Sequence, residues 1–285
     1  MKSLIIGGSS DLGQYLIKSN KSEYDFTIFK KKIPGGIKFD LIKDRVADLD
    51  LSNYESILIL SAVSNPTLCE QNPEYSRKLN VEATIKLIDH CINKNKKIIF
   101  FSTEFIYNGF KGNYNEQDHP DPINLYGQQK LEVENFIKEN SSKYSILRIA
   151  KTYTNNFNDQ TLFSFFYKKI IKEKSKEIPI IEDEYFSPLY IGDLCDLVFY
   201  CTKNDVKFLN IGGPERLSRV DCLNLFLSNF KKKNIEKKIY IRKNTLNDAK
   251  IPKDVSFNIN KARNIKKNMV TIQYFLKKFH EENIL

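Results

Sequence analysis

Short apolar runs alternate with amphipathic stretches through the first half of the chain. The runs that we interpret as buried strands are 3–6, 26–29, 57–60, 97–101 and 145–149. The stretches with helical spacing of apolar positions are 12–19, 73–93 and 123–140. Strands that are apolar on both faces and are separated by helices are typical of a parallel sheet covered on both sides. Because crossovers between parallel strands are right-handed, the pattern predicts a doubly wound Rossmann-type α/β fold.

This regular alternation weakens after residue 151. The further elements that we expect are a loop at 155–159, helices at 162–172 and 220–230, and a strand at 208–211. We find no internal repeat and no linker that would separate independent units. We therefore expect an NAD(P)-binding Rossmann core over 1–150 and a smaller, mainly substrate-binding lobe over 151–285. Segments around 178–211 are expected to return to the core.

Composition and charge exclude several classes of protein. A chain of 285 residues with 41% hydrophobic residues can bury a sizeable core. The 45 Lys and Arg residues outnumber the 35 Asp and Glu residues, which gives a net charge of +10. Only seven of the basic residues are Arg, whose guanidinium binds phosphates and base edges in a bidentate way that the Lys ammonium cannot. We therefore expect no nucleic-acid partner. A general bias toward Lys explains the excess charge.

The cysteine and histidine content favours a reducing compartment. The five cysteines form no C-x-x-C pair, and the three histidines are scattered, so we expect no metal site. The N-terminus lacks the regions of a signal peptide, and no stretch approaches 18 consecutive apolar residues. We therefore expect a cytoplasmic protein without a membrane partner.

A glycine-rich turn follows the first predicted strand. Gly7 and Gly13 have the spacing of a G-x-x-G-x-x-G turn, with Ser10 in place of the middle glycine. Such a turn presents backbone N–H groups and the positive end of a helix to a pyrophosphate. Glycines here can also serve geometry alone, but a turn on the first strand of a strand–helix series favours a dinucleotide. The candidate cofactor-binding residues of this turn are Gly7, Ser9, Ser10, Asp11, Leu12 and Gly13.

Tyr126 and Lys130 form a Y-x-x-x-K pair at helical spacing. Residues four apart share one helix face, so the phenol and the ammonium can serve one site. By itself this pair is more often a surface tyrosine beside a solvated lysine. Thr103 adds context, because it lies at the carboxyl end of a predicted parallel strand, where such folds bind ligands. The three side chains around one nicotinamide would make a ketone-reduction site.

The end of the second predicted strand bears on the choice of cofactor. Lys30 and Lys31 stand where an acidic residue would accept the ribose hydroxyls of NAD, and no carboxylate follows until Asp40. Cations there suit a 2′-phosphate, so NADP(H) is favoured and NAD(H) stays an alternative. A lysine-rich chain also produces such runs by chance. The other candidate cofactor-binding residues are Asp40, Leu41, Ser61, Ala62, Val63, Ser64 and Ser102, with Tyr126 and Lys130.

Five blocks of sequence, in the same order, resemble a known family. The blocks are S-A-V at 61–63 with C-E at 69–70 and N-V at 80–81, F-S-T-E-F-I-Y-N-G at 101–109, Y-N-E at 114–116 with N-L-Y-G at 124–127, F-S-P-L-Y-I-G-D-L at 186–194 and N-I-G-G-P-E-R-L-S-R at 210–219. They are similar to the extended short-chain dehydrogenase/reductases, and most to the dTDP-4-dehydrorhamnose reductase branch.

This resemblance implies NADP(H)-dependent reduction of the 4-keto group of a nucleotide-activated 4-keto-6-deoxyhexose, in the biosynthesis of surface-polysaccharide sugars. It implies that Tyr126 protonates the developing alkoxide and that Thr103 hydrogen-bonds the same oxygen. Lys130 would bind the nicotinamide ribose and lower the pKa of the phenol. The implied partner is a nucleotide-diphosphate sugar, and a homodimer is allowed. The candidate substrate-binding residues are Thr103, Glu104, Phe105, Asn156, Phe157 and Arg216.

Departures from the family pattern limit the alternatives. Phe105 stands where the related dehydratases have a catalytic Glu and where enzymes of the GDP-fucose synthase type have a catalytic Cys. The loss of these bases favours plain reduction over elimination or C3/C5 epimerisation. A nucleotide-sugar C4 epimerase stays open, as does a non-catalytic NADP-binding regulatory subunit resembling the methionine adenosyltransferase β subunit. Glu104 and Phe105 also replace an Asp and a Tyr of the reductase branch, and Arg216 could instead form a structural pair with a carboxylate.

Overall fold

The apolar runs of the first half form the strands of one parallel sheet. The computed structural model describes residues 2–20, 22–29, 33–175, 177–178, 180–229 and 249–282. In these ranges seven strands make the main sheet: β1 (Lys2–Ile6), β2 (Tyr24–Ile28), β3 (Ile37–Lys38), β4 (Tyr54–Ile59), β5 (Lys97–Thr103), β6 (Tyr144–Ile149) and β10 (Phe208–Ile211). Their order is β10-β6-β5-β4-β1-β2-β3, and every pair is parallel. The predicted doubly wound Rossmann-type fold is confirmed.

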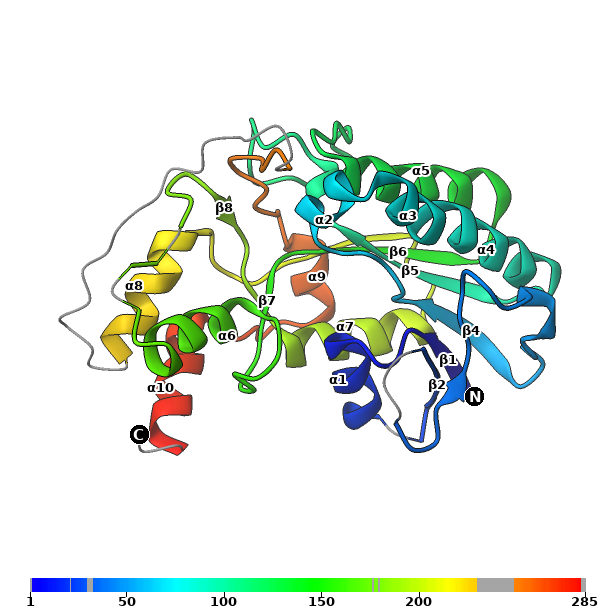
Figure 1. Ribbon diagram of the computed structural model, residues 1–285, viewed down its shortest axis with the longest axis horizontal. Coiled ribbons are helices and arrows are strands. Elements are labelled where there is room, and N and C mark those ends of the chain that lie inside the picture. The colour runs from blue at the N-terminus through cyan, green and yellow to red at the C-terminus, as the bar shows by residue number, and fades with distance from the viewer. Residues whose placement is uncertain are drawn as a thin grey trace.

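Helices cover both faces of this sheet (Figure 1). On one face lie α2 (Pro66–Gln71), α3 (Pro73–Arg77), α4 (Thr84–Asn93) and α5 (Leu125–Asn140). On the other face lie α1 (Asp11–Ser19), α7 (Ile191–Lys203) and α9 (Asn260–Ile265). Short 3₁₀ turns occupy Val46–Asp48 and Glu104–Ile106. Since ligands of such folds bind at the carboxyl ends of the strands, the site is expected where β1, β4 and β5 end.

The long helix predicted over 73–93 is widened in its middle. α3 passes into a π-helical turn at Lys78–Ala83 before α4 begins. One extra residue per turn brings Asn80 into the interior, where it is 1% exposed. The apolar spacing predicts the extent of the helix correctly, but a π turn leaves no clear mark in that spacing.

The second half builds a lobe beside the sheet (Figure 1). Its elements are α6 (Leu162–Tyr167) with a π turn at Lys168–Lys172, α8 (Arg219–Asn229), α10 (Ile272–Glu282), the parallel pair β7 (Thr152–Tyr153) and β9 (Leu189–Tyr190), and the antiparallel pair β8 (Tyr185–Phe186) and β11 (Leu217–Ser218). The sequence predicted α6 and α8 but not α7, α9 or α10. β10 pairs with β6 and is therefore a strand of the main sheet. α7 contacts α1, which covers one face of that sheet. The division of the chain at residue 150 stays a prediction.

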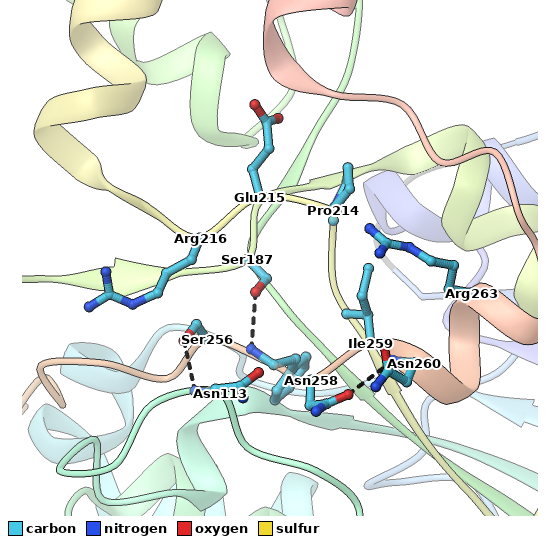
Figure 2. A pocket seen from close by; sticks show the side chains of 12 residues that line it. Asn113, Ser187, Pro214, Glu215, Arg216, Ser256, Asn258, Ile259, Asn260 and Arg263 are labelled. Carbon is cyan, nitrogen blue, oxygen red and sulfur yellow. Dashed lines mark hydrogen bonds between the residues drawn. The ribbon is translucent and has the colours of Figure 1, made fainter.

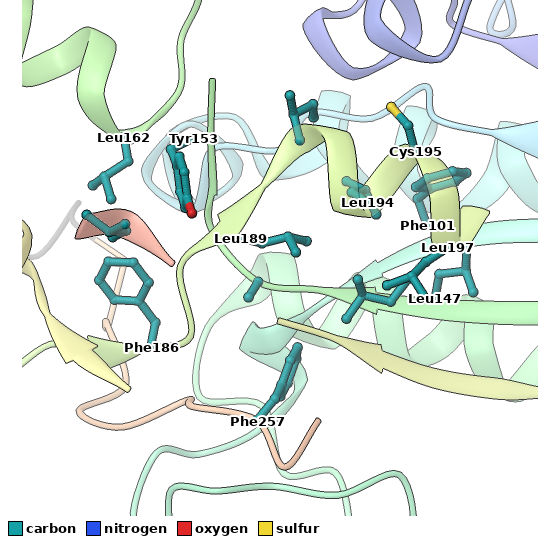
Figure 3. Packing of buried hydrophobic residues seen from close by; sticks show 14 of the residues in the cluster. Phe101, Leu147, Tyr153, Leu162, Phe186, Leu189, Leu194, Cys195, Leu197 and Phe257 are labelled. Atoms are coloured by element: carbon teal, nitrogen blue, oxygen red, sulfur yellow. The ribbon is translucent and has the colours of Figure 1, made fainter. Parts of the chain in front are cut away.

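One hydrophobic cluster continues from the sheet into the lobe. Figure 3 shows Phe101 and Leu147 on the sheet, Leu189 between the two parts, and Tyr153 and Phe186 toward the lobe. All five side chains are buried. The five cysteines are also buried, and each is free. Of the helices in the described ranges, none combines the length and apolar character that crossing a lipid bilayer requires.

Candidate active site

The turn between β1 and α1 has the close contacts that a dinucleotide-binding loop needs. Gly7 has a φ of +91°, and a Cβ there would lie 2.6 Å from the Oγ of Ser61. A Cβ on Gly13 would lie 2.8 Å from the Cα and the carbonyl oxygen of Gly8. Both positions therefore have room for glycine alone, which gives the tight turn and the close helix packing typical of a dinucleotide-binding loop.

Ser10 replaces the middle glycine of the pattern and caps α1. Its Oγ accepts a hydrogen bond from the N–H of Gly13 at 3.1 Å and donates one to the carbonyl of Gly7 at 2.9 Å. This is ordinary N-cap geometry, and a glycine could not supply it. Ser10, in place of the middle glycine, therefore stabilises the start of α1.

The first turn of α1 faces the lobe. The Asp11 carboxylate accepts a hydrogen bond from the N–H of Gln160 at 3.0 Å. Ser9 and Leu12 are half-buried on either side of Asp11. The amides at a helix start have no carbonyl partner within the helix, and the positive end of the dipole favours a phosphate. The predicted pyrophosphate site thus lies next to a contact between the two halves of the chain.

The predicted adenine side is only partly described. Lys30 and Lys31 lie outside the described residues. The Asp40 carboxylate accepts a hydrogen bond from the N–H of Ile42 at 3.0 Å and so closes a local turn. The Leu41 side chain is buried in the core, so only its backbone could face an adenine. Contact of Asp40 and Leu41 with a cofactor stays a prediction.

The segment after β4 is held in place by Asn80. The N–H of Val63 donates to Asn80 Oδ1 at 2.8 Å, and Asn80 Nδ2 donates to the Val63 carbonyl at 3.1 Å. The same Nδ2 donates to Gln129 Oε1 on α5 at 2.7 Å. Ser61, Ala62 and Val63 are half-buried, and Ser64 is exposed. The π turn therefore ties the predicted cofactor segment to the helix that carries Tyr126.

Thr103, Tyr126 and Lys130 come together, and we call them the candidate catalytic trio. Thr103 ends β5, and its side chain lies near enough to the Tyr126 hydroxyl to lower the pKa of that phenol. Tyr126 is the second residue of α5, whose start is capped by Asn124. Lys130 Nζ donates to the Phe101 carbonyl at 2.8 Å and lies 5.9 Å from the ring centroid of Tyr126. All three members are less than a tenth exposed.

Burial dominates the electrostatics of the candidate catalytic trio. Burial raises the pKa of Tyr126, Cys69 and Glu104 raise it further, and the Thr103 side chain opposes them. Burial also lowers the pKa of Lys130 to about 8, against the opposite influence of Glu134. The lowered phenol pKa that the family resemblance implies is not found in this structure, because desolvation of the phenolate outweighs its neighbours.

Glu104 is a buried acid directly after Thr103. It is 5% exposed and accepts a hydrogen bond from the N–H of Lys151, while its Oε2 has no hydrogen-bond partner among the described residues. Burial, with the nearby Glu184, raises the pKa of Glu104 to about 8. Glu184 itself is paired with Arg219 at 2.6 Å. Glu104 can therefore present either a protonated or an ionised carboxyl near neutral pH.

Phe105 and Ser102 lie next to the candidate catalytic trio. The Phe105 ring meets the Tyr126 ring edge-on at 6.5 Å between centroids, and its N–H donates to Thr103 Oγ1 at 3.2 Å. A Cβ on Gly127 would lie 2.1 Å from the Phe105 carbonyl oxygen, so only glycine fits there. Ser102 is buried, and its Oγ has no hydrogen-bond partner within the described part of the chain.

Asn156 and Phe157 serve local structure. The Asn156 side chain accepts a hydrogen bond from the N–H of Asn158 at 3.1 Å and closes an exposed turn. Phe157 packs against Tyr167 and Phe279, with ring centroids 4.7 and 4.6 Å away. These contacts occupy much of the Phe157 ring, and the substrate contact expected of both residues stays a prediction.

Arg216 has the carboxylate partner that its structural interpretation requires. Its guanidinium lies 2.7 Å from Asp254 and 4.0 Å from the ring centroid of Tyr185. It also lines a pocket of about 270 Å³, with Arg263 on the other side (Figure 2). The lining residues of this pocket do not include the candidate catalytic trio. Pairing of Arg216 with a diphosphate stays a prediction.

Three comparisons relate this chain to known proteins. A family model described as the RmlD substrate binding domain matches residues 1–283. A solved structure of a hypothetical dTDP-4-dehydrorhamnose reductase from Sulfolobus tokodaii is 27% identical, covers 96% of this chain and 99% of that one, and has a TM-score of 0.82. The dTDP-4-dehydrorhamnose reductase from Bacillus anthracis str. Ames in complex with NADP is 21% identical, covers 99% and 100%, and has a TM-score of 0.83.

Curated relatives include a protein of a different role. The methionine adenosyltransferase 2 subunit beta of Xenopus tropicalis is 22% identical over 219 residues, which is 74% of this chain and 65% of that protein. The match covers 46% of the methionine adenosyltransferase 2 subunit beta of Bos taurus and 58% of the dTDP-4-dehydrorhamnose reductase of Aggregatibacter actinomycetemcomitans. Similarity to the reductases therefore extends over whole structures, whereas sequence similarity to the curated relatives is partial.

Several residues around the site were given no role from the sequence. Asn80 and Gln129 hold the segment after β4, and Glu134 pairs with Arg148 behind Lys130. The available signals were the spacing of Glu134, four residues after Lys130, and a single charge within the apolar run of β6. No group of three or more His, Cys, Asp or Glu side chains in the described ranges could hold a metal ion.

Proposed function

The chain belongs to the RmlD substrate binding domain family, and from that membership we propose that it is an NADP(H)-dependent reductase of the 4-keto group of a nucleotide-activated 4-keto-6-deoxyhexose. The observation that carries the proposal is that Thr103, Tyr126 and Lys130 lie buried together at the carboxyl end of β5, with Tyr126 and Lys130 on the same helix face. A donor pair at one point is what a ketone oxygen needs when it becomes an alkoxide.

Each member of the candidate catalytic trio has a distinct task. Tyr126 keeps its proton near neutral pH because burial raises its pKa, so it is ready to donate that proton to the substrate oxygen. Thr103, next to the phenol, supplies a second hydrogen bond to the same substrate oxygen. Lys130 contributes positive charge beside the phenol and a donor toward the cofactor ribose. Its hydrogen bond to the Phe101 carbonyl holds the ammonium in position.

The glycine-rich turn fits a dinucleotide. Side chains at Gly7 or Gly13 would collide with Ser61 or with the backbone of Gly8, so both glycines are needed for the tight turn and close helix packing typical of a dinucleotide-binding loop. When bound, a reduced nicotinamide supplies the hydride. The start of α1 would hold the pyrophosphate, and the segment that Asn80 anchors would hold the ribose. NADP(H) is the favoured cofactor, with NAD(H) as the alternative.

The substrate would bind between the end of β5 and the lobe. Glu104 and Phe105 lie next to the reacting position, and Arg216 lines the pocket at the edge of the sheet. The proposed substrate is a nucleotide-diphosphate sugar, and the proposed setting is the cytoplasm and the synthesis of surface-polysaccharide sugars. A homodimer is compatible with this proposal.

A second candidate is a non-catalytic NADP-binding regulatory subunit. The observation that favours it is the similarity to a methionine adenosyltransferase beta subunit over 74% of this chain. Against it stands the complete candidate catalytic trio, which a pure binder does not need. A C4 epimerase would use the same trio but would retain its NAD and give no net oxidation.

The test measures NADPH oxidation at 340 nm with 4-keto-6-deoxyhexoses linked to dTDP, UDP or GDP. We expect turnover with at least one of them, loss of turnover in Tyr126→Phe, and a reduced sugar nucleotide by mass spectrometry. Tight NADPH binding without oxidation of any of these substrates would contradict the reductase and favour the regulatory subunit. Interconversion at C4 with retained NAD would favour the epimerase.

A further inference from the structure

A fully buried ion pair lies one helical turn behind Lys130. Glu134 on α5 faces Arg148 on β6, with Nη2 to Oε2 at 2.7 Å and Nε to Oε1 at 3.2 Å. The side chains are 0% and 3% exposed. Both oxygens of one carboxylate are thus bound by the two prongs of one guanidinium, away from solvent.

Arg148 is held from every side. Its Nη1 donates to the Tyr107 hydroxyl at 2.8 Å, and its guanidinium carbon lies 5.5 and 5.3 Å from the ring centroids of Tyr107 and Phe208. These contacts fix the guanidinium between two aromatic rings. Glu134 therefore faces a cation that these contacts hold in place.

Lys130 is the group that this carboxylate can influence. It lies four residues before Glu134, on the same face of α5. The groups that face the Lys130 ammonium are Glu134 and Tyr126 on α5, Cys69 on α2, and the Phe101 carbonyl and Phe100 ring on β5. Of these, Glu134 is the fixed negative charge. Burial lowers the pKa of Lys130 to about 8, and Glu134 is the strongest influence in the opposite direction.

A buried ion pair is a poor way to stabilise a fold. Two charges lose their hydration, and well-packed apolar residues of similar size often give equal or greater stability. The position of this pair suggests a different benefit. We propose that Glu134 and Arg148 are positioning residues for catalysis, which set a fixed negative charge beside Lys130 and keep its ammonium charged and oriented. This inference rests on the proposed function, in which Lys130 acts next to Tyr126.

The test compares Glu134→Gln with wild type across pH 6–9.5. Without the Glu134 carboxylate, the Lys130 ammonium loses its proton at a lower pH than in wild type. We therefore expect the alkaline decline of kcat/KM to begin at a lower pH in Glu134→Gln than in wild type. At pH 8.5 the ratio of kcat/KM to its pH 7 value should be about threefold to tenfold lower than in wild type. Glu139→Gln, an exposed glutamate on the same helix, is the matched control and should keep the wild-type profile.

A double variant guards against failure to fold, because Glu134→Gln leaves Arg148 without its carboxylate. Glu134→Gln/Arg148→Met removes both charges, and we expect a shift in the same direction but smaller than in Glu134→Gln. A second readout needs no turnover: the affinity for NADPH, titrated by its fluorescence, should weaken with rising pH earlier in both variants.

The outcomes separate this inference from the function on which it rests. If both variants keep the wild-type pH dependence and lose only thermal stability, the pair is structural and the inference is overturned. If Lys130→Met retains full activity, the role of Lys130 in the proposed function fails instead. Loss of activity in Lys130→Met together with the shifted limb in Glu134→Gln supports both.

Discussion

The reaction proposed here depends, at the scale of single residues, on one hydroxyl. Tyr126→Phe removes the proton donor but keeps the ring and its edge contact with Phe105. We expect kcat to fall by about 10²-fold or more, the usual scale of general acid catalysis, while the affinity for NADPH stays nearly unchanged. Steady-state kinetics and a fluorescence titration with NADPH measure the two quantities. Tyr75→Phe, a half-exposed tyrosine on α3, is the control; full activity of Tyr126→Phe would refute the assigned role.

Glu104 gives a prediction on the pH dependence of stability. Its pKa is raised to about 8 in the folded protein, against about 4.3 for a free glutamate. A raised pKa gives stability that is fully present below about pH 4.3 and is lost as the pH rises through 8. Wild type should therefore lose stability across this window relative to Glu104→Gln, by at most about 1.4 kcal/mol for each pH unit. Urea unfolding at pH 5 and pH 8.5 measures the difference, and equal differences at the two pH values would contradict the prediction.

The sequence indicates where some candidate site residues lie and not where others lie, for a physical reason. Tyr126 and Lys130 share a helix, so their spacing alone brings them together, and the end of a strand brings Thr103 to the same edge. Arg216, in contrast, meets Asp254, 38 residues away, and Leu41 turns its side chain into the core. Contacts between distant segments, such as that of Arg216, leave no periodic pattern for the sequence to reveal.

At the scale of elements, the turn from β1 into α1 sets the cofactor site. Gly13 lies against the backbone of Gly8, and a backbone atom cannot rotate away from a new Cβ. We expect Gly13→Ala to displace the start of α1, to cost about 1–3 kcal/mol of stability and to weaken NADPH binding about tenfold or more. Thermal unfolding and a fluorescence titration test this. Lys18→Ala on the exposed side of the same helix is the control; unchanged affinity in Gly13→Ala would argue against a dinucleotide on this turn.

Regular elements were predictable where apolar spacing alone decides them. Six strands of the main sheet and the extent of the helix over 73–93 follow from that spacing, whereas the two-residue strands, β3 among them, are too short to show it. The π turn at Lys78–Ala83 does not follow from the spacing. One added residue displaces the apolar positions by less than their ordinary irregularity along a helix. α7, α9 and α10 were not predicted, and Pro188, just before α7, suggested irregular structure there.

At the scale of the whole molecule, polar links join the lobe to the sheet near the candidate site. Asp11 at the start of α1 binds the Gln160 backbone. Lys151, directly beyond the sheet, gives its N–H to Glu104, which follows the end of β5. A substrate between sheet and lobe would lie among these links, so the relative position of the two parts bears directly on activity.

The apolar core makes the same connection, and it gives the last prediction. One buried cluster contains Leu58 and Ile99 of the sheet together with Phe163, Phe226 and Leu276 of the lobe. Because separating the two parts would expose this shared surface, we expect the chain to unfold in a single transition despite its length. Urea unfolding followed by far-ultraviolet circular dichroism, which reports helices, and by tyrosine absorbance, which reports packing, should give coincident curves. Two separated transitions would mean that the lobe can open independently of the sheet.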